Sequence, residues 1–196
     1  LLGMEKMITE KKVHAIVVGP FRSESLIAGM DLIAKHKVPF LGTIAMSPKS
    51  EEKVKENPEK YKYVFRVCLN AKYLVTYLAQ ALDFMKAEFG YDQLFVMTQD
   101  GLWAKATGTG TAGVVESKMG YKIKGQEVYP TGASDFSAGL IKAKGQNAQI
   151  ILTVFDMPQS GILLKQWKRM KIPAMVAGFI SQMAGTGGWQ TVEGNS

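Results

Sequence analysis

Short apolar runs alternate along the chain with longer segments in which apolar residues recur every three or four positions. The first run, residues 13–18, reads Val-His-Ala-Ile-Val-Val and predicts a strand buried on both faces of a parallel sheet. It ends at Gly19-Pro20, and Ser23 then precedes a helical pattern over residues 24–36. A strand that leads through a hydroxyl-rich loop into a helix favours binding of an anion or small ligand there. A serine at that place is also a common helix N-cap, and both interpretations stay open.

The same alternation continues to the end of the chain. Strands are predicted over residues 13–18, 38–42, 63–67, 94–97, 122–129, 150–155 and 174–177. Helices are predicted over residues 1–12, 24–36, part of 49–60, 71–89, 103–118, 135–144 and 159–170. This order indicates an α/β fold of βαβ units, with parallel sheets flanked by helices. The pattern divides into two similar units that join near residues 63–71.

Right-handed crossovers place the loops that follow parallel strands along one edge of a sheet. In this chain those loops are residues 19–25, 43–48, 98–103, 130–136, 155–158 and 178–188. They are therefore where a ligand site is expected.

Length and composition are those of a soluble globular protein. The 196 residues suffice for one large or two modest domains, and 46% are hydrophobic and 21% charged. No apolar run approaches the roughly 20 residues of a membrane span. Residues 1–12 have the pattern of the end of an amphipathic helix, so we expect the true beginning of the protein to lie upstream. The absence of a signal peptide therefore says nothing about the compartment.

Charge and cysteine content exclude several classes of partner. The net charge is +7, but basic residues are interleaved with acidic ones, as in residues 49–62, so nucleic acid is not an expected partner. Cys68 is the single cysteine, and His14 and His36 are the only histidines, too few for a plausible zinc site. We expect Cys68 and His14 to be packed side chains, and we expect neither a metal nor a cofactor.

Several motifs occur in an order and spacing that resemble a known family. They are VVGPFRSES, VPFLGTIAMSP, YVFRV, FGYDQLFVMTQDGLWA, YPTGASDFSAGLIKAK and IILTVFDMPQSGILLKQWKRMKIP. Together they resemble the substrate-binding proteins of branched-chain amino acid ABC transporters, the type I periplasmic binding protein family. The resemblance covers about residues 1–190, and PTGASDFSA is its most characteristic part.

The resemblance implies a two-lobe α/β fold that closes on a small ligand, an amino acid or related carboxylate, and delivers it to a membrane permease. It implies a periplasmic or other extracytoplasmic location. Measured against the family, residues 1–68 are a partial N-terminal lobe and residues 71–190 are the second lobe. A sheet that lacks strands leaves unpaired backbone edges, so we expect association through that edge or a larger native protein.

The resemblance also assigns ligand-binding residues. Ser23 takes the place of the serine that grips the ligand carboxylate, and Ile44, Ala45 and Met46 form the second loop, whose backbone N–H groups complete that grip. Met46 has no hydroxyl, so the backbone carries more of the contact. Trp103 takes the place of an aromatic ring that covers the ligand, and packing in the core is the alternative for this residue.

Two positions depart from the family pattern. Ile180 stands where the family has the acid that binds the ligand amino group, and Asp156 stands at a tyrosine position. Because a buried ammonium needs a carboxylate, either Asp156 supplies it or the ligand is a carboxylic acid without an amino group. The alternative for Asp156 is a helix N-cap, and Asp135 is interpreted as an N-cap. Arg22 either adds a guanidinium to an anionic ligand or points to solvent.

Three functions remain to be weighed. A transport-associated receptor is the leading hypothesis, and a ligand-sensing regulatory domain on the same fold is the alternative. An enzyme is not expected, because the sequence has no GxSxG and no GxxxxGK[ST] motif. The glycine-threonine run 107–113 resembles a dinucleotide motif but falls inside a predicted helix.

Overall fold

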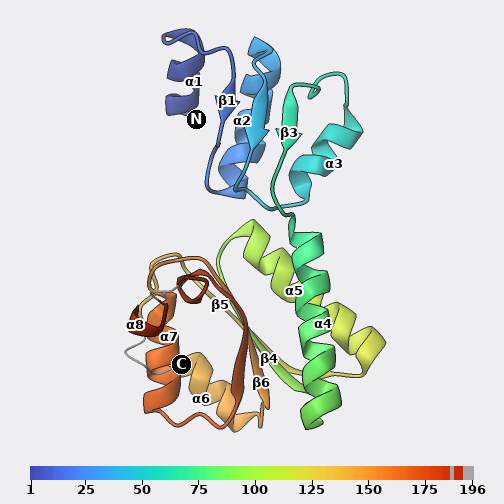
Figure 1. Cartoon of the computed structure of the whole chain (residues 1–196), viewed down its shortest axis with the longest axis vertical. Helices are drawn as coiled ribbons and strands as arrows, with labels where there is room; N and C mark the ends of the chain where they lie inside the picture. Colours follow the sequence, from blue (N-terminus) through green and yellow to red (C-terminus); the bar gives the residue numbers. More distant parts are fainter. Residues whose placement is uncertain (186–187, 192–196) are drawn as a thin grey trace. The chain divides into compact units, whose positions relative to one another are not determined.

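A computed structural model describes residues 1–185 and 188–191 and divides the chain into two compact units, each with its own parallel sheet (Figure 1). We call Leu1–Leu74 the first unit and Val75–Ser196 the second unit. The α/β class and the parallel pairing predicted from the alternating pattern are confirmed.

The first unit has three strands in the order β1-β2-β3, all parallel. Its elements are α1 (Leu2–Thr9), β1 (Ile16–Val17), α2 (Ser23–His36), β2 (Phe40–Gly42), α3 (Lys49–Glu56), β3 (Val64–Arg66) and the start of α4 (Ala71–Phe89). Phe40 is 1% exposed and packs in a core with Met30 and Ile33 of α2. Its ring lies so close to Gly19 that a Cβ there would approach ring carbons to 2.2 Å, so only glycine fits.

The first predicted strand is shorter and less buried than its sequence suggested. Only Ile16 and Val17 are in strand conformation, and Val17 is 63% exposed. Within the described residues β1 pairs with β2 alone, so it is an edge strand that packs one face through Ile16. The prediction of a strand buried on both faces is therefore wrong, and His14 is exposed rather than packed.

The second unit has four parallel strands in the order β5-β4-β6-β7. Its elements after α4 are β4 (Gln93–Gln99), α5 (Leu102–Met119), β5 (Lys122–Tyr129), α6 (Ser137–Gly145), β6 (Ile150–Phe155), α7 (Ser160–Arg169), β7 (Met175–Ile180), the 3₁₀ turn η1 (Ser181–Met183) and α8 (Gly188–Thr191). Helix α5 covers one face of the sheet, and α6 and α7 cover the other (Figure 1).

Alternate residues of β4 supply the two cores of this sandwich. Phe95 and Met97 pack with α6 and α7, whereas Val96 and Thr98 face α5. A Cβ at Gly108 of α5 would lie 2.5 Å from Cγ2 of Thr98, so the helix and strand approach each other closely. The glycine-threonine run lies in a helix, as predicted, and its small residues permit this packing.

We expect Thr98→Val to raise the free energy of unfolding by about 1 kcal/mol. Thr98 is fully buried, and within the described residues its Oγ1 has no hydrogen-bond partner, so the valine removes an unpaired hydroxyl at nearly constant volume. Thr153→Val on β6 is the matched control, because Oγ1 of Thr153 donates to the carbonyl of Ala177 at 3.3 Å. Urea unfolding of both variants is the measurement, and the control is expected to be destabilised. Equal changes in the two variants would contradict this interpretation.

Burial alters the acidity of two tyrosines in the second unit. Tyr121 is 3% exposed, and its hydroxyl donates to the carbonyl of Leu82 at 2.6 Å. Its burial, helped by the charge of nearby Asp83, raises the pKa of Tyr121 to about 12. Burial likewise raises the pKa of Tyr129 to about 12. The folded protein therefore favours the neutral phenol of both residues.

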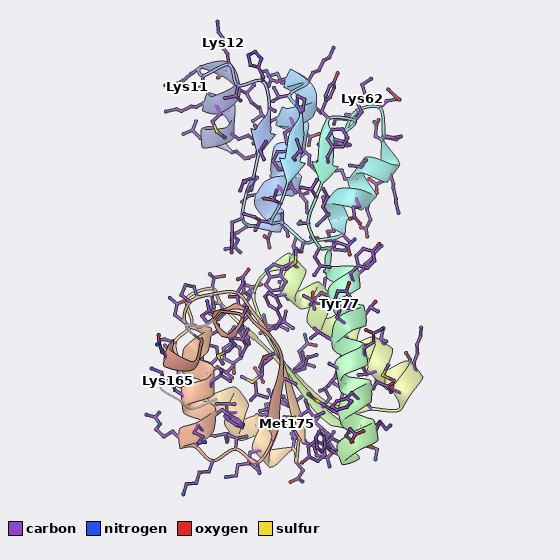
Figure 2. The ribbon with its side chains drawn as sticks, in the orientation of Figure 1. Lys11, Lys12, Lys62, Tyr77, Lys165 and Met175 are labelled. Atoms are coloured by element: carbon purple, nitrogen blue, oxygen red, sulfur yellow. The ribbon has the colours of Figure 1, made fainter. Side chains whose placement is uncertain are left out.

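Stability is expected to fall as pH rises from about 10 towards 12. Below pH 10 the Tyr121 hydroxyl is protonated in both the folded and the unfolded protein. Above pH 10 it loses its proton first in the unfolded chain, which lowers the free energy of unfolding by about 2 kcal/mol at pH 12. Urea midpoints at increasing pH measure this slope. The slope should flatten in Tyr121→Phe and not in Tyr77→Phe, an exposed tyrosine on α4 (Figure 2). The same slope in all three proteins would rule out Tyr121 as its source.

Candidate functional site

In the loop after β2, the backbone carbonyls of three residues accept hydrogen bonds from other residues of the first unit. The carbonyl of Ala45 accepts from Nη1 of Arg66 at 2.5 Å, and that of Ser47 accepts from Nη2 of the same arginine at 2.5 Å. Between them, the carbonyl of Met46 accepts from the backbone N–H of Ala71 at 2.8 Å. Three consecutive carbonyls are therefore held from within the unit.

The N–H groups of this loop have a different environment. Across residues 1–185 and 188–191, no oxygen accepts a hydrogen bond from the backbone N–H of Ile44, Ala45 or Met46. Successive backbone N–H groups without internal partners are suited to an anion such as a carboxylate. The loop after β2 is thus a candidate anion site made of backbone donors.

Ser23 joins this loop to the start of α2. The residue is 1% exposed, and its Oγ accepts from the backbone N–H of Ser47 at 3.1 Å. Because α2 begins at Ser23 itself, with Arg22 at the N-cap position and no side-chain cap, the N-cap interpretation is wrong. Arg22 is exposed, and its Nε lies 3.7 Å from Oε2 of Glu24. Contact of Ser23 or Arg22 with a ligand stays a prediction.

In the second unit, Gln99 connects the ends of β4 and β6. Gln99 is 5% exposed, and its Oε1 accepts from the backbone N–H groups of Asp156 at 2.8 Å and Met157 at 3.1 Å. Its Nε2 donates to the Asp156 carboxylate. The N-cap interpretation of Asp156 is therefore wrong, since α7 begins at Ser160 with Gln159 at the N-cap position.

The loop after β7 is attached to the same point. The backbone carbonyl of Asp156 accepts from Oγ of Ser181 at 3.1 Å and from Nε2 of Gln182 at 3.4 Å. The ends of β4, β6 and β7 thus share one polar network around Asp156. Ile180, where the family pattern has an acid, is half-buried and packs against the core.

Trp103 packs within the second unit. The residue lies in the first turn of α5, is 6% exposed, and meets Phe179 of β7 edge-to-face with ring centroids 5.6 Å apart. Core packing, the alternative weighed for this residue, is therefore observed. A role as the cover of a ligand stays a prediction.

Asp135 lies one residue before the N-cap position of α6, which the sequence analysis expected it to occupy. The N-cap position of α6 is Phe136, and Oδ1 of Asp135 accepts from the N–H of Ser137 at 3.0 Å and from Nε2 of Gln166 at 3.2 Å. The hydrogen bonds from Ser137 hold the pKa of the Asp135 carboxyl below its usual value. Asp135 therefore orients the start of α6.

Other chemistry at these loops is limited. Among the described residues there is no group of three His, Cys, Asp or Glu side chains that could hold a metal ion, and no helix that is long and apolar enough to cross a membrane. Cys68 is half-buried, with its Sγ 3.7 Å from the Ala45 carbonyl. Figure 2 shows Lys11, Lys12 and Lys62 at the edge of the first unit where its strands begin, opposite the loop after β2.

Two residues of these networks, Arg66 and Gln99, were not among the sequence predictions. Each left a weak signal. Arg66 is a charged residue inside the apolar strand Tyr-Val-Phe-Arg-Val, and Gln99 is a polar residue at the end of the apolar run of β4.

Comparison with known proteins agrees with the family that the sequence motifs resemble. A family model described as "Periplasmic binding protein" matches residues 2–194. No curated protein matches the chain.

Several solved structures share its fold. A putative branched-chain amino acid ABC transporter protein from Silicibacter pomeroyi has a TM-score of 0.73 at 17% identity, covering 98% of this chain and 49% of that chain. The binding protein LivJ from Streptococcus pneumoniae, in complex with isoleucine, has a TM-score of 0.74 at 19% identity, and the match covers 97% of this chain and 51% of that chain. A solute-binding protein from R. palustris, in complex with 4-hydroxybenzoate, has a TM-score of 0.75 at 17% identity, and the match covers 89% of this chain and 45% of that chain. The chain thus spans about half the length of these proteins.

We expect Gln99→Glu to destabilise the protein at pH 7 by about 2 kcal/mol, because a second carboxylate then faces Asp156 where an amide N–H donated. The defect should shrink at acid pH, where one proton is shared between the two carboxyl groups. Urea unfolding at pH 7 and pH 4 measures both effects.

The double variant Gln99→Glu with Asp156→Asn is the control. It restores one donor and one acceptor with their roles exchanged, and it keeps an acceptor for the two backbone N–H groups. Recovery of most of the lost stability is expected. A double variant as unstable as the sum of its parts would show that this contact does not determine the effect.

Proposed function

Because the chain belongs to the periplasmic binding protein family, we propose that it is the solute-binding part of an ABC transporter that binds a small amino acid or related carboxylate. The solute is delivered to a membrane permease, and the protein acts outside the cytoplasm. Binding itself is the activity, and the chain carries out no covalent chemistry.

The loop after β2 is the observation that carries this proposal. Its carbonyls at Ala45, Met46 and Ser47 each already accept a hydrogen bond from a donor of the first unit. Its N–H groups at residues 44–46 have no acceptor among the described residues. Such donors favour an anion as the ligand group, and a carboxylate matches a short row of N–H donors.

Ser23 strengthens the same site. Its Oγ accepts from the backbone N–H of Ser47, and no described residue accepts from its own hydroxyl hydrogen, which can be donated to an acceptor beside the loop. We propose that Ser23 and residues 44–46 together bind the carboxylate of the ligand.

Asp156 decides the class of carboxylate. Its side chain receives a hydrogen bond from the neutral amide of Gln99, which orients the carboxylate. We propose that this carboxylate binds the ligand amino group, the task that Ile180 cannot perform, and that Trp103 covers the ligand. The isoleucine and the 4-hydroxybenzoate of the two related complexes are both carboxylates, and only the first has an amino group.

Titration calorimetry with L-leucine, L-isoleucine, 4-methylpentanoate and 4-hydroxybenzoate tests the proposal. The amino acids should bind, and 4-methylpentanoate, which is leucine without its amino group, should bind at least tenfold more weakly. Asp156→Asn should remove most of that difference, because it removes the charge that selects the ammonium. Equal affinity for leucine and 4-methylpentanoate would exclude Asp156 as the ammonium partner and favour a simple carboxylic acid as the ligand.

Ser23→Ala should weaken binding of every ligand that binds by about tenfold, since it removes one hydrogen bond to a charged group. Ser25→Ala, two residues further along α2, is the matched control and should bind as the parent does. Unchanged affinity in Ser23→Ala would remove the serine from the site. A protein that binds none of the four compounds would overturn the proposed ligand class.

A further inference from the structure

Arg66, the last residue of β3, has a side chain that is nearly enclosed by the protein. It is 14% exposed, and its guanidinium donates to the carbonyls of Ala45 and Ser47 and to Oγ of Ser50, each at 2.5 Å. All of these acceptors belong to the loop after β2 or to the first turn of α3. One side chain therefore fixes the loop at two of its carbonyls.

The charge of Arg66 is balanced inside the unit. Its Nε lies 3.1 Å from Oε1 of Glu51, an ion pair without the alignment of a hydrogen bond. Glu51 is held in turn by Nδ2 of Asn70, at 3.0 and 3.1 Å from its two oxygens. Oδ1 of Asn70 accepts from the backbone N–H groups of Lys72 and Tyr73 at the start of α4. The guanidinium is thus a fixed, neutralised part of the scaffold and does not attract an anion by its net charge.

Because the peptide bond is planar, a contact to a carbonyl of the loop also orients the N–H group of the next residue. In a trans peptide the C=O of one residue and the N–H of the next point in opposite directions. When Arg66 holds the carbonyl of Ala45, it turns the N–H of Met46 away from itself. The next peptide shows the same relation, because the carbonyl of Met46 is held by Ala71 and the N–H of Ser47 donates to Ser23.

We propose that Arg66 is the positioning residue of the ligand site: it contacts the loop from behind and presents the Met46 N–H to the ligand carboxylate. This inference rests on the proposed function, since it assumes that the loop binds a carboxylate. The guanidinium suits the task because its planar fork reaches two carbonyls at once, whereas a lysine ammonium at the same place has no fixed geometry.

Arg66→Lys is the variant that tests the proposal, because it keeps the charge and removes the fork. The first measurement is amide hydrogen exchange of the protein without ligand. The N–H groups of Ser47 and Ala71 are protected only while the loop is in place, so their exchange should become about tenfold faster. Arg169→Lys, at an exposed position on α7, is the matched control and should leave both rates unchanged.

The second measurement is the ratio of affinities for a carboxylate and its amide, with L-leucine and L-leucinamide as probes. Arg66→Lys should weaken leucine about tenfold and leave leucinamide unchanged, so the ratio falls. Loss of stability alone would lower both affinities together or neither, and the urea midpoint of each variant is recorded alongside.

A second variant keeps the test informative if Arg66→Lys does not fold. Ser50→Ala removes an acceptor of Arg66 and a donor at 3.1 Å to the Ser47 carbonyl, so it should raise exchange at Ser47 several-fold with Arg66 still present. Unchanged exchange and an unchanged ratio in the folded variants would overturn the positioning role. If the parent protein binds neither a carboxylate nor an amide, the proposed function fails, and the exchange rates alone decide whether Arg66 holds the loop.

Discussion

Backbone groups that leave a parallel sheet have lost their ladder partners, and where they are buried each needs a new one. An unpaired buried N–H or C=O costs about 1–3 kcal/mol, so a loop of a few residues at the carboxyl edge of a sheet can lose as much as a small domain gains in total. Both units of this protein supply such partners in the same way. A long polar side chain at the end of one strand reaches across to the loop that follows the neighbouring strand: Arg66 of β3 to the loop after β2, and Gln99 of β4 to the loop after β6.

The two side chains differ in what they leave available. Arg66 has donors only, so it binds carbonyls of the loop and none of the N–H groups. Gln99 uses its amide oxygen for two backbone N–H groups and its amide nitrogen for the Asp156 carboxylate. One loop thus retains backbone donors, and the other carries a carboxylate whose orientation Gln99 fixes. The chemistry of each loop follows from the single strand-end residue that stabilises it.

Much of the fold could be predicted from periodicity, because burial of each face leaves a local pattern of apolar residues. The strands and helices of the second unit appear within a few residues of their predicted ranges, as β6 and α5 show. The exposure of Val17 among the described residues could not be predicted, because an apolar run does not show how many strands pair with its own strand. Arg66 and Gln99 were missed for a related reason. The hydrogen-bond partners of Arg66 lie 16 to 21 residues away and those of Gln99 lie 57 and 58 residues away, so these contacts can be identified only once the order of the strands is known.

The same reasoning bears on the ligand. Asp156 is a carboxylate that a neutral amide orients, and a carboxylate favours a cation over an anion beside it. The loop after β2 has the opposite preference, because its backbone N–H groups are donors and favour an anion. Each unit therefore contributes a group of its own polarity, and in each case one strand-end side chain, Arg66 or Gln99, fixes the orientation of that group.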